Sequence, residues 1–333
     1  MADLPWPRGS ATGVGSLPGT DIAEAQRLVF GELPDLPYLA ELPDRGPGAD
    51  MIGRSAGLLV DLPVQLYAGR WQIAPRPGKD LRRIAGLLER DLDQLTELGD
   101  GFHGTIKVQA AGPWTLGAGI DLPIGGRMLR DAGAVRDLTE SLAEGLRRHV
   151  ADVRKRLPGA SVLLQLDEPS LPAVLAGRVP TESGLSAYRA VDPIDATSAL
   201  RTVVDAAEAP IVVHCCAPDV PLRAIRDSGA VAVSFDLDQF GGGLDPLGEA
   251  LENGLGLFAG AVPTRPPPDG SGPTSQAVAE RVRTLWTRLG FPAARLPEQV
   301  VVTPACGLAG APMSYARTAS RVCREAAHRL AEV

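Results

Sequence analysis

Short apolar runs alternate with longer amphipathic segments along most of the 333 residues, and this alternation limits the possible folds more than any other feature. Because parallel strands need helical crossovers, the alternation predicts an α/β protein built on a parallel sheet. Eight runs have the length and apolar content of strands, at residues 11–16, 36–42, 105–111, 161–167, 210–216, 230–236, 256–262 and 299–306. Helical periodicity lies between them, near residues 21–30, 52–67, 79–98, 134–156, 195–208, 219–228, 244–253, 274–289 and 313–331.

Eight strand–helix units predict a single (β/α)8 barrel of the TIM type over residues 1–333, because closing the sheet removes its two exposed edges. Residues 43–100 are long enough for an insertion with two helices after the second strand. An open, doubly wound sheet is the alternative architecture. No solenoid-type repeat and no change in composition divides the chain, so we expect one domain.

Charge and cysteine content narrow the class of function. The 33 basic and 40 acidic residues give a formal charge of −7, which predicts neither a nucleic-acid partner nor an anionic membrane surface. No stretch approaches the roughly 18 apolar residues of a membrane span, and residues 1–10 contain two prolines where a signal peptide would be apolar. We therefore expect a cytoplasmic protein, whose four cysteines serve metal or thiol chemistry rather than disulfides.

Polar residues gather at the ends of the predicted strands, where the active sites of barrels are built. Six of the eight strands end this way, with Gly15-Ser16, Glu41, Asp167-Glu168, His214 to Cys216, Asp236 and Cys306. The pattern predicts a site at the carboxyl ends of the strands.

Four of these residues are suited to bind a metal ion. Residues two apart on a strand share a face, so His214 and Cys216 project together, and Asp236 and Cys306 end other strands. One imidazole, one carboxylate and two thiolates form a plausible four-coordinate zinc site. The alternative is that the cysteines are small buried hydrophobic residues, the commonest role of that side chain.

Seven segments, taken in order, resemble the catalytic domain of the cobalamin-independent methionine synthase family. They are Gly15-Ser16-Leu17-Pro18, the Glu41 to Met51 segment with Arg45 and Asp50, Gly112-Pro113-Trp114-Thr115, Asp167-Glu168-Pro169, His214-x-Cys216, Asp236 and Cys306-Gly307-Leu308. The resemblance extends from about residue 12 to residue 310.

The resemblance implies zinc-dependent transfer of a methyl group to a thiol, with homocysteine as the preferred acceptor and methionine as the product. It implies that His214, Cys216, Asp236 and Cys306 hold zinc, with His214, Cys216 and Cys306 forming the catalytic centre. A free thiol has a pKa near 8.5, and metal coordination removes its proton. Two thiolates and a carboxylate leave about one negative charge on the Zn²⁺ centre, so a bound sulfur stays nucleophilic.

The resemblance also implies an amino-acid pocket formed by Ser16, Glu41, Met51 and Asp167. Glu41 and Asp167 would hold the ammonium group, and backbone N–H groups at Ser16 would hold the carboxylate. Trp114 would either stack on a flat ligand or form part of the wall. The structural alternatives are a helix cap at Asp167 and an ordinary loop start at Ser16.

Three departures from the family pattern bear on the reaction. Asp236 is one methylene shorter than the glutamate of the family, and no segment corresponds to an additional N-terminal half. Residues 260–266 contain no histidine, whereas the family uses one there to protonate the folate leaving group. We therefore expect a methyl-corrinoid, carried by a corrinoid protein, or another activated donor rather than methyltetrahydrofolate.

Two other functions fit the same residues. One is alkyl transfer to a different thiol such as coenzyme M, although Glu41 and Asp167 would repel its sulfonate. The other is a non-catalytic zinc-binding or thiol-binding protein that has lost its donor pocket. Zinc content and selective binding of homocysteine would distinguish the three.

Overall fold

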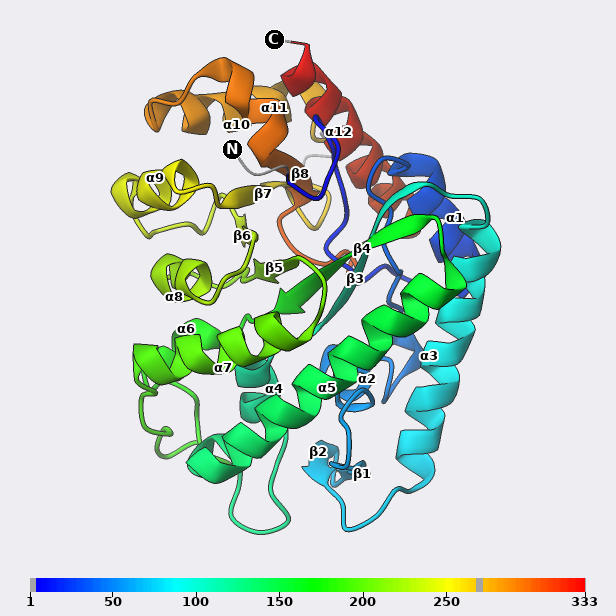
Figure 1. Cartoon of the computed structure of the whole chain (residues 1–333), viewed down its shortest axis with the longest axis vertical. Helices are drawn as coiled ribbons and strands as arrows, with labels where there is room; N and C mark the ends of the chain where they lie inside the picture. Colours follow the sequence, from blue (N-terminus) through cyan, green and yellow to red (C-terminus); the bar gives the residue numbers. More distant parts are fainter. Residues whose placement is uncertain (1–3, 268–271, 333) are drawn as a thin grey trace.

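Six parallel strands form one curled sheet in the computed structural model, which describes residues 4–267 and 272–332 (Figure 1). The strands follow one another in chain order across the sheet. They are β3 (Gly104–Ala111), β4 (Ala160–Asp167), β5 (Ile211–His214), β6 (Ala232–Asp236), β7 (Gly256–Val262) and β8 (Val300–Pro304). The α/β class and the parallel sheet are therefore confirmed.

Helices cover the outer side of this sheet (Figure 1). The longer ones are α1 (Ile22–Glu32), α3 (Lys79–Leu98), α5 (Ala132–Arg156), α7 (Pro193–Ala206), α9 (Leu244–Glu252), α10 (Ser275–Arg288) and α12 (Met313–Ala331). The shorter ones are α2 (Met51–Ala56), α4 (Pro113–Gly119), α6 (Leu171–Leu175), α8 (Leu222–Asp227) and α11 (Leu296–Gln299). Helices α5, α7, α8 and α9 contact one another in that order, as do α3, α1, α12 and α10. Within the described residues, no helix combines the length and the apolar character needed to cross a bilayer.

The first two predicted strands are extended segments rather than regular strands. Isolated parallel bridges join Ala11 to Val302 of β8, Ser16 to Glu41, and Tyr38 to Lys107 of β3. A complete barrel of eight regular strands is thus not confirmed. Close packing explains the irregularity in part, since a Cβ on Gly13 would lie 2.4 Å from the Tyr38 ring, and Pro37 has no N–H to donate to a ladder.

The insertion after the second segment is only partly helical. The prediction of a helix over 52–67 was wrong beyond α2, because an antiparallel hairpin follows it, with strands β1 (Val64–Tyr67) and β2 (Arg70–Ile73). Ala68 and Gly69 form its two-residue turn with φ values of 48° and 79°. Positive φ at both positions is typical of the tight turns that match the twist of a hairpin.

The concave face of the sheet changes from apolar to polar along the strands. The layer nearer the amino ends of the strands is a small apolar cluster that includes Leu36, Leu163, Val212, Ala232, Phe258 and Val301. Two residues further along the same strands lie Gln165, His214, Ser234 and Thr303, with Gly260 at the equivalent position of β7. Because residues two apart share a face, the second layer places buried polar groups toward the carboxyl ends of the strands.

Candidate metal and substrate site

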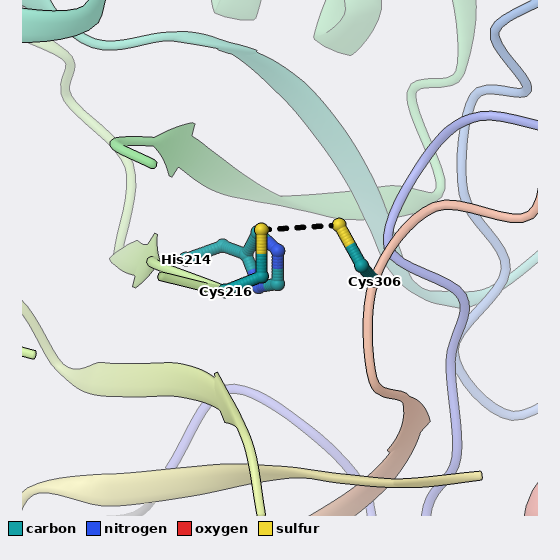
Figure 2. Close-up of side chains that lie close together, drawn as sticks. All are labelled: His214, Cys216 and Cys306. Atoms are coloured by element: carbon teal, nitrogen blue, oxygen red, sulfur yellow. Dashed lines mark hydrogen bonds between the residues drawn. The ribbon is translucent and has the colours of Figure 1, made fainter. Parts of the chain in front are cut away.

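Three of the predicted metal ligands lie together at the carboxyl ends of β5 and β8. His214 ends β5, Cys216 follows it by two residues, and Cys306 follows the end of β8 by two residues. One ligand atom from each lies within 4.8 Å of the other two, and the two sulfurs are 3.2 Å apart. Figure 2 shows the three side chains converging from the two chain segments. The curl of the sheet brings these segments together, although β6 and β7 separate them in strand order.

The ring of His214 is held by one of its nitrogens. Nδ1 lies 2.9 Å from Oγ of Ser234 on β6. Nε2 is buried and has no hydrogen-bond partner among the described residues. When Nδ1 carries the proton and donates it to Ser234, the lone pair of Nε2 is available to a cation. A buried nitrogen without a partner costs free energy, and a bound metal ion would remove that cost.

The two thiols differ in acidity because they share one proton. One hydrogen bond joins the two sulfurs, and together with nearby His214 it lowers the pKa of Cys306 to about 4, against the effect of burial. The same bond and burial raise the pKa of Cys216. Ligand atoms around a tetrahedral zinc ion lie about 3–4 Å apart. The donor set and its spacing therefore fit a borderline-soft divalent cation.

Asp236 lies outside this group of ligand atoms. It ends β6, and its Oδ1 accepts a hydrogen bond of 2.9 Å from the backbone N–H of Asp238. Its role as the fourth ligand stays a prediction, since the group of ligand atoms within 4.8 Å of one another does not include it. The shorter side chain has less reach than glutamate toward the other three groups.

Glu41 ends the second extended segment and is buried beside a positive charge. Arg54 of α2 places Nε 3.3 Å from Oε1 of Glu41 and also binds the carboxylate of Asp91 on α3. Burial raises the pKa of Glu41, and Arg54 acts in the opposite direction. Met51, the first residue of α2, is half-buried and packs against the main core. The insertion therefore positions Glu41 through an ion pair.

Asp167 lies next to the predicted metal ligand His214. It ends β4 opposite His214 in the parallel register, and Gln165 donates a hydrogen bond of 2.7 Å to its Oδ1. Burial raises the pKa of Asp167 to about 7, while His214 opposes that shift and Glu41 adds to it. An ammonium group bound here would lower the pKa again and keep the carboxylate ionised.

Ser16 lies against the segment that carries Cys306. Its carbonyl accepts a hydrogen bond of 2.8 Å from the N–H of Leu308. A Cβ on Gly307 would lie 2.1 Å from the Ser16 hydroxyl oxygen, so this approach requires glycine. Ser16, Asp167 and the three ligands therefore belong to one region of the molecule.

Trp114 has the contacts of a packing residue. Its Nε1 donates to the carbonyl of Ala196 on α7 at 3.1 Å, and the ring is buried. It lines a cavity of about 580 Å³ beside α5 and α7, whose lining includes none of the predicted metal ligands. The structure does not bring Trp114 together with the His214, Cys216 and Cys306 side chains, so its role in substrate binding stays a prediction.

Sequence reasoning missed three buried polar residues, Lys107, Gln165 and Ser234. Lys107 interrupts an apolar predicted strand, and such an interruption could have marked it. Gln165 and Ser234 precede predicted strand ends by two residues, which places them on the same face as those ends.

The fold and the site together define a curled parallel α/β protein with a cluster of one imidazole and two thiols at its strand ends that could hold a metal ion. The sequence profile of the family described as cobalamin-independent synthase, catalytic domain, matches residues 10–329. The chain belongs to this family, which confirms the resemblance seen in its motifs. A search of curated proteins found no match.

Two solved structures were found similar to this chain at low sequence identity. A B12-independent methionine synthase from Shewanella sp. W3-18-1, in complex with selenomethionine, is 11% identical with a TM-score of 0.65, and the match covers 98% of each chain. A GH113 beta-mannanase from Alicyclobacillus acidocaldarius is 13% identical with a TM-score of 0.46, over 98% of this chain and 99% of its own. The first likeness supports the fold.

Proposed function

We propose that this protein transfers a methyl group to the sulfur of homocysteine and forms methionine at a zinc centre. The observation that carries the proposal is the cluster of His214, Cys216 and Cys306, with a buried His214 nitrogen that lacks a partner. Family membership supports the reaction class.

His214, Cys216 and Cys306 would hold the zinc ion, which supplies the positive charge that lowers the pKa of an incoming thiol. In the transfer, the sulfur of the deprotonated acceptor forms a bond to the methyl carbon as the bond between donor and methyl breaks. The bonding pair stays on the donor, so no oxidant or reductant is needed. The role of the chain is to position the acceptor sulfur and to shield it from water.

Glu41 and Asp167 would bind the ammonium group of the acceptor, with Ser16 and Met51 completing the pocket. Both carboxylates are buried, and Asp167 is paired with His214 in the sheet. Two carboxylates favour an amino acid over coenzyme M, because a sulfonate would meet like charge. Homocysteine, and not coenzyme M, is therefore expected to raise the melting temperature of the zinc-loaded protein.

The methyl donor would be one that needs no imidazole acid. Residues 260–267 contain no histidine, and the three histidines other than His214 lie before β3, within α5 and within α12. No positioned acid would then protonate the leaving nitrogen of methyltetrahydrofolate, and the rate of methyl transfer would fall about 10²–10⁴-fold. The comparisons give no support for a corrinoid protein as partner, and assays with methyltetrahydrofolate and with methylcobalamin would decide. Robust turnover with methyltetrahydrofolate would contradict this part of the proposal.

Zinc stoichiometry and X-ray absorption, with and without homocysteine, test the central proposal. We expect about one zinc per chain with sulfur ligands, and one further sulfur when homocysteine is present. Cys306→Ser should lower the zinc content, whereas Cys323→Ala, which changes a buried cysteine of α12, should not. A protein that binds no zinc, or binds it equally after Cys306→Ser, would contradict the proposal. Zinc binding without methyl transfer from any donor would favour a non-catalytic zinc-binding or thiol-binding protein.

A further inference from the structure

A lysine lies fully buried on the concave face of the sheet. The ammonium group of Lys107 on β3 makes three hydrogen bonds, to the carbonyl of Val14 at 2.9 Å, to Oε1 of Gln165 at 2.8 Å and to Oε1 of Gln109 at 3.3 Å. It also lies 5.2 Å from the centre of the Tyr38 ring. An ammonium group has three donors, and all three are used here. Because burying an ammonium group costs free energy, the filling of space alone does not explain why a lysine stands here.

Gln165 connects this lysine to Asp167. Its Oε1 accepts from Lys107, while its Nε2 donates to the carbonyl of Val14 at 2.8 Å and to Oδ1 of Asp167 at 2.7 Å. A flipped amide would place its N–H₂ group against the ammonium and its oxygen against the Val14 carbonyl. Lys107, the Val14 carbonyl and Asp167 therefore all favour the orientation in which the N–H₂ group faces Asp167, and Lys107 is the group that holds the amide oxygen.

The charge of Lys107 also acts on the carboxylates of the proposed acceptor pocket. Burial lowers the pKa of Lys107 to about 8, while Asp167 and Glu41 act in the opposite direction. The lysine thus stays charged at pH 7. Lys107 thus places a positive charge near Asp167 and Glu41, of which Glu41 is also paired with Arg54, and an ammonium group from an acceptor would favour the ionised form of Asp167 further.

We propose that Lys107 is a positioning residue that, through Gln165, selects acceptor thiols carrying an ammonium group. The inference rests on the proposed function, in which Asp167 binds that group. The amide held by Lys107 donates to Oδ1 of Asp167, which fixes the carboxylate at the end of β4. Without the lysine, the amide oxygen has no donor, the hydrogen bond from Nε2 to Asp167 is held from the other side by the Val14 carbonyl alone, and the carboxylate is oriented less firmly.

Binding of two thiols to the zinc-loaded protein tests the inference. The probes are homocysteine and 4-mercaptobutanoate, which has the same chain and carboxylate but no amino group, measured by calorimetry. Lys107→Met and Gln165→Met each keep a side chain of similar length in the interior. Lys155→Met, at an exposed position of α5, is the matched control. Zinc content and the circular dichroism melting curve establish that each variant is folded and loaded.

Lys107→Met and Gln165→Met should each weaken homocysteine binding about 10- to 100-fold and change 4-mercaptobutanoate binding less than about twofold. The double variant should lose no more than the stronger single variant, because both substitutions break one chain of hydrogen bonds. Lys155→Met should bind like the wild type.

Folded, zinc-loaded variants that keep the wild-type preference for homocysteine would overturn the inference while leaving the proposed function intact. Equal losses for both thiols, or additive losses in the double variant, would also overturn it, since they indicate general structural damage. A zinc-loaded wild type that binds neither thiol, or shows no preference for homocysteine, would contradict the proposed function itself. If the Lys107→Met variant fails to fold, the affinities of Gln165→Met for homocysteine and 4-mercaptobutanoate decide whether the inference holds.

Discussion

At the scale of single residues, the hydroxyl of Ser234 decides which nitrogen of His214 is free. The 2.9 Å contact with Nδ1 leaves Nε2 without a partner in the interior. Hydrogen bonds of this kind to metal-binding histidines fix the tautomer and the orientation of the ring. The same contact would therefore set the affinity for zinc without any direct bond to the ion.

We predict that Ser234→Ala lowers the zinc affinity about 10- to 100-fold, because the ring loses its fixed tautomer and orientation. Competition with a chelator of known zinc affinity measures the change. Ser320→Ala removes another buried hydroxyl, which binds the carbonyl of Ala316 within α12, and should leave zinc affinity unchanged. Equal zinc affinity in Ser234→Ala and wild type would contradict this role.

At the scale of elements, a buried carboxylate ties β4 to the start of α4. Glu168 accepts hydrogen bonds from the N–H groups of Trp114 at 3.0 Å and Thr115 at 2.8 Å. These are among the N–H groups that a helix leaves unpaired in its first turn, where negative charge is favourable. Glycine is required at 112, because a Cβ there would lie 2.3 Å from Oε1 of Glu168. The Gly-Pro-Trp-Thr and Asp-Glu-Pro motifs thus contact each other through the Glu168 carboxylate.

We predict that Gly112→Ala lowers the free energy of unfolding by about 1–3 kcal/mol, because the carboxylate of Glu168 must move from the helix N-terminus. Urea unfolding measures the change. The matched control is Gly86→Ala on the exposed face of α3, where an added Cβ meets nothing within 4 Å. That substitution should stabilise the protein by about 0.5–1 kcal/mol through helix propensity. Equal effects of the two substitutions would contradict the contact.

Helix α5 contains a histidine that should make the protein sensitive to acid. Burial, with the charge of Arg54 adding to it, lowers the pKa of His149 from 6.5 to about 4. Between pH 6.5 and pH 4 the unfolded chain therefore binds more protons than the folded one. The stability contributed by this histidine is complete above pH 6.5 and is lost as the pH falls toward 4.

We predict that the free energy of unfolding decreases by about 2 kcal/mol between pH 7 and pH 5 through His149 alone. His149→Leu should remove that part of the pH dependence, because leucine binds no proton. Urea unfolding of both proteins at the two pH values measures the difference. His328→Leu alters an exposed histidine near Asp35 and serves as the control. Identical pH dependence in wild type and His149→Leu would show that His149 does not titrate as proposed.

At the scale of the whole molecule, the curl of the sheet brings the three predicted metal ligands together. Cys216 and Cys306 are 90 positions apart in the chain, yet their sulfurs are 3.2 Å apart. Two strands lie between β5 and β8, and the bridges of the first two segments connect the β3 and β8 edges of the sheet. A bound ion would therefore cross-link distant parts of the fold.

We predict that zinc stabilises the folded protein by about 4 kcal/mol when its free concentration exceeds the Kd about 1,000-fold. Chelation should lower the melting temperature and leave the far-ultraviolet circular dichroism at 25 °C nearly unchanged, because the core does not depend on the ion. The melting temperature of the His214→Ala variant should be the same with and without zinc. If chelation leaves the melting temperature of the wild type unchanged, the prediction that zinc stabilises the fold is contradicted.

The periodicity of the sequence predicted most helices and six of the eight strands, and the ends of β3, β4, β6 and β7 coincide with the predicted ones. Helix α12 has the predicted bounds of 313–331, and β7 has those of 256–262. The hairpin of residues 64–73 was not predicted, because its strands have only four residues each and follow a helical pattern. Short segments carry too little periodicity to separate a strand from a helix.

The sequence by itself determined the order of elements, the side chains at the strand ends, Cys306 among them, and the common face of His214 and Cys216, since alternation along a strand is a local property. Only the tertiary structure decided that those three side chains lie together and that Asp236 accepts a hydrogen bond from the N–H of Asp238. It also decided that the buried ammonium group of Lys107 donates to Val14 and Gln165. Such contacts depend on how far the sheet curls and on which segments join its edges. Twist and packing accumulated over many strands set these quantities, and no short window of sequence contains them.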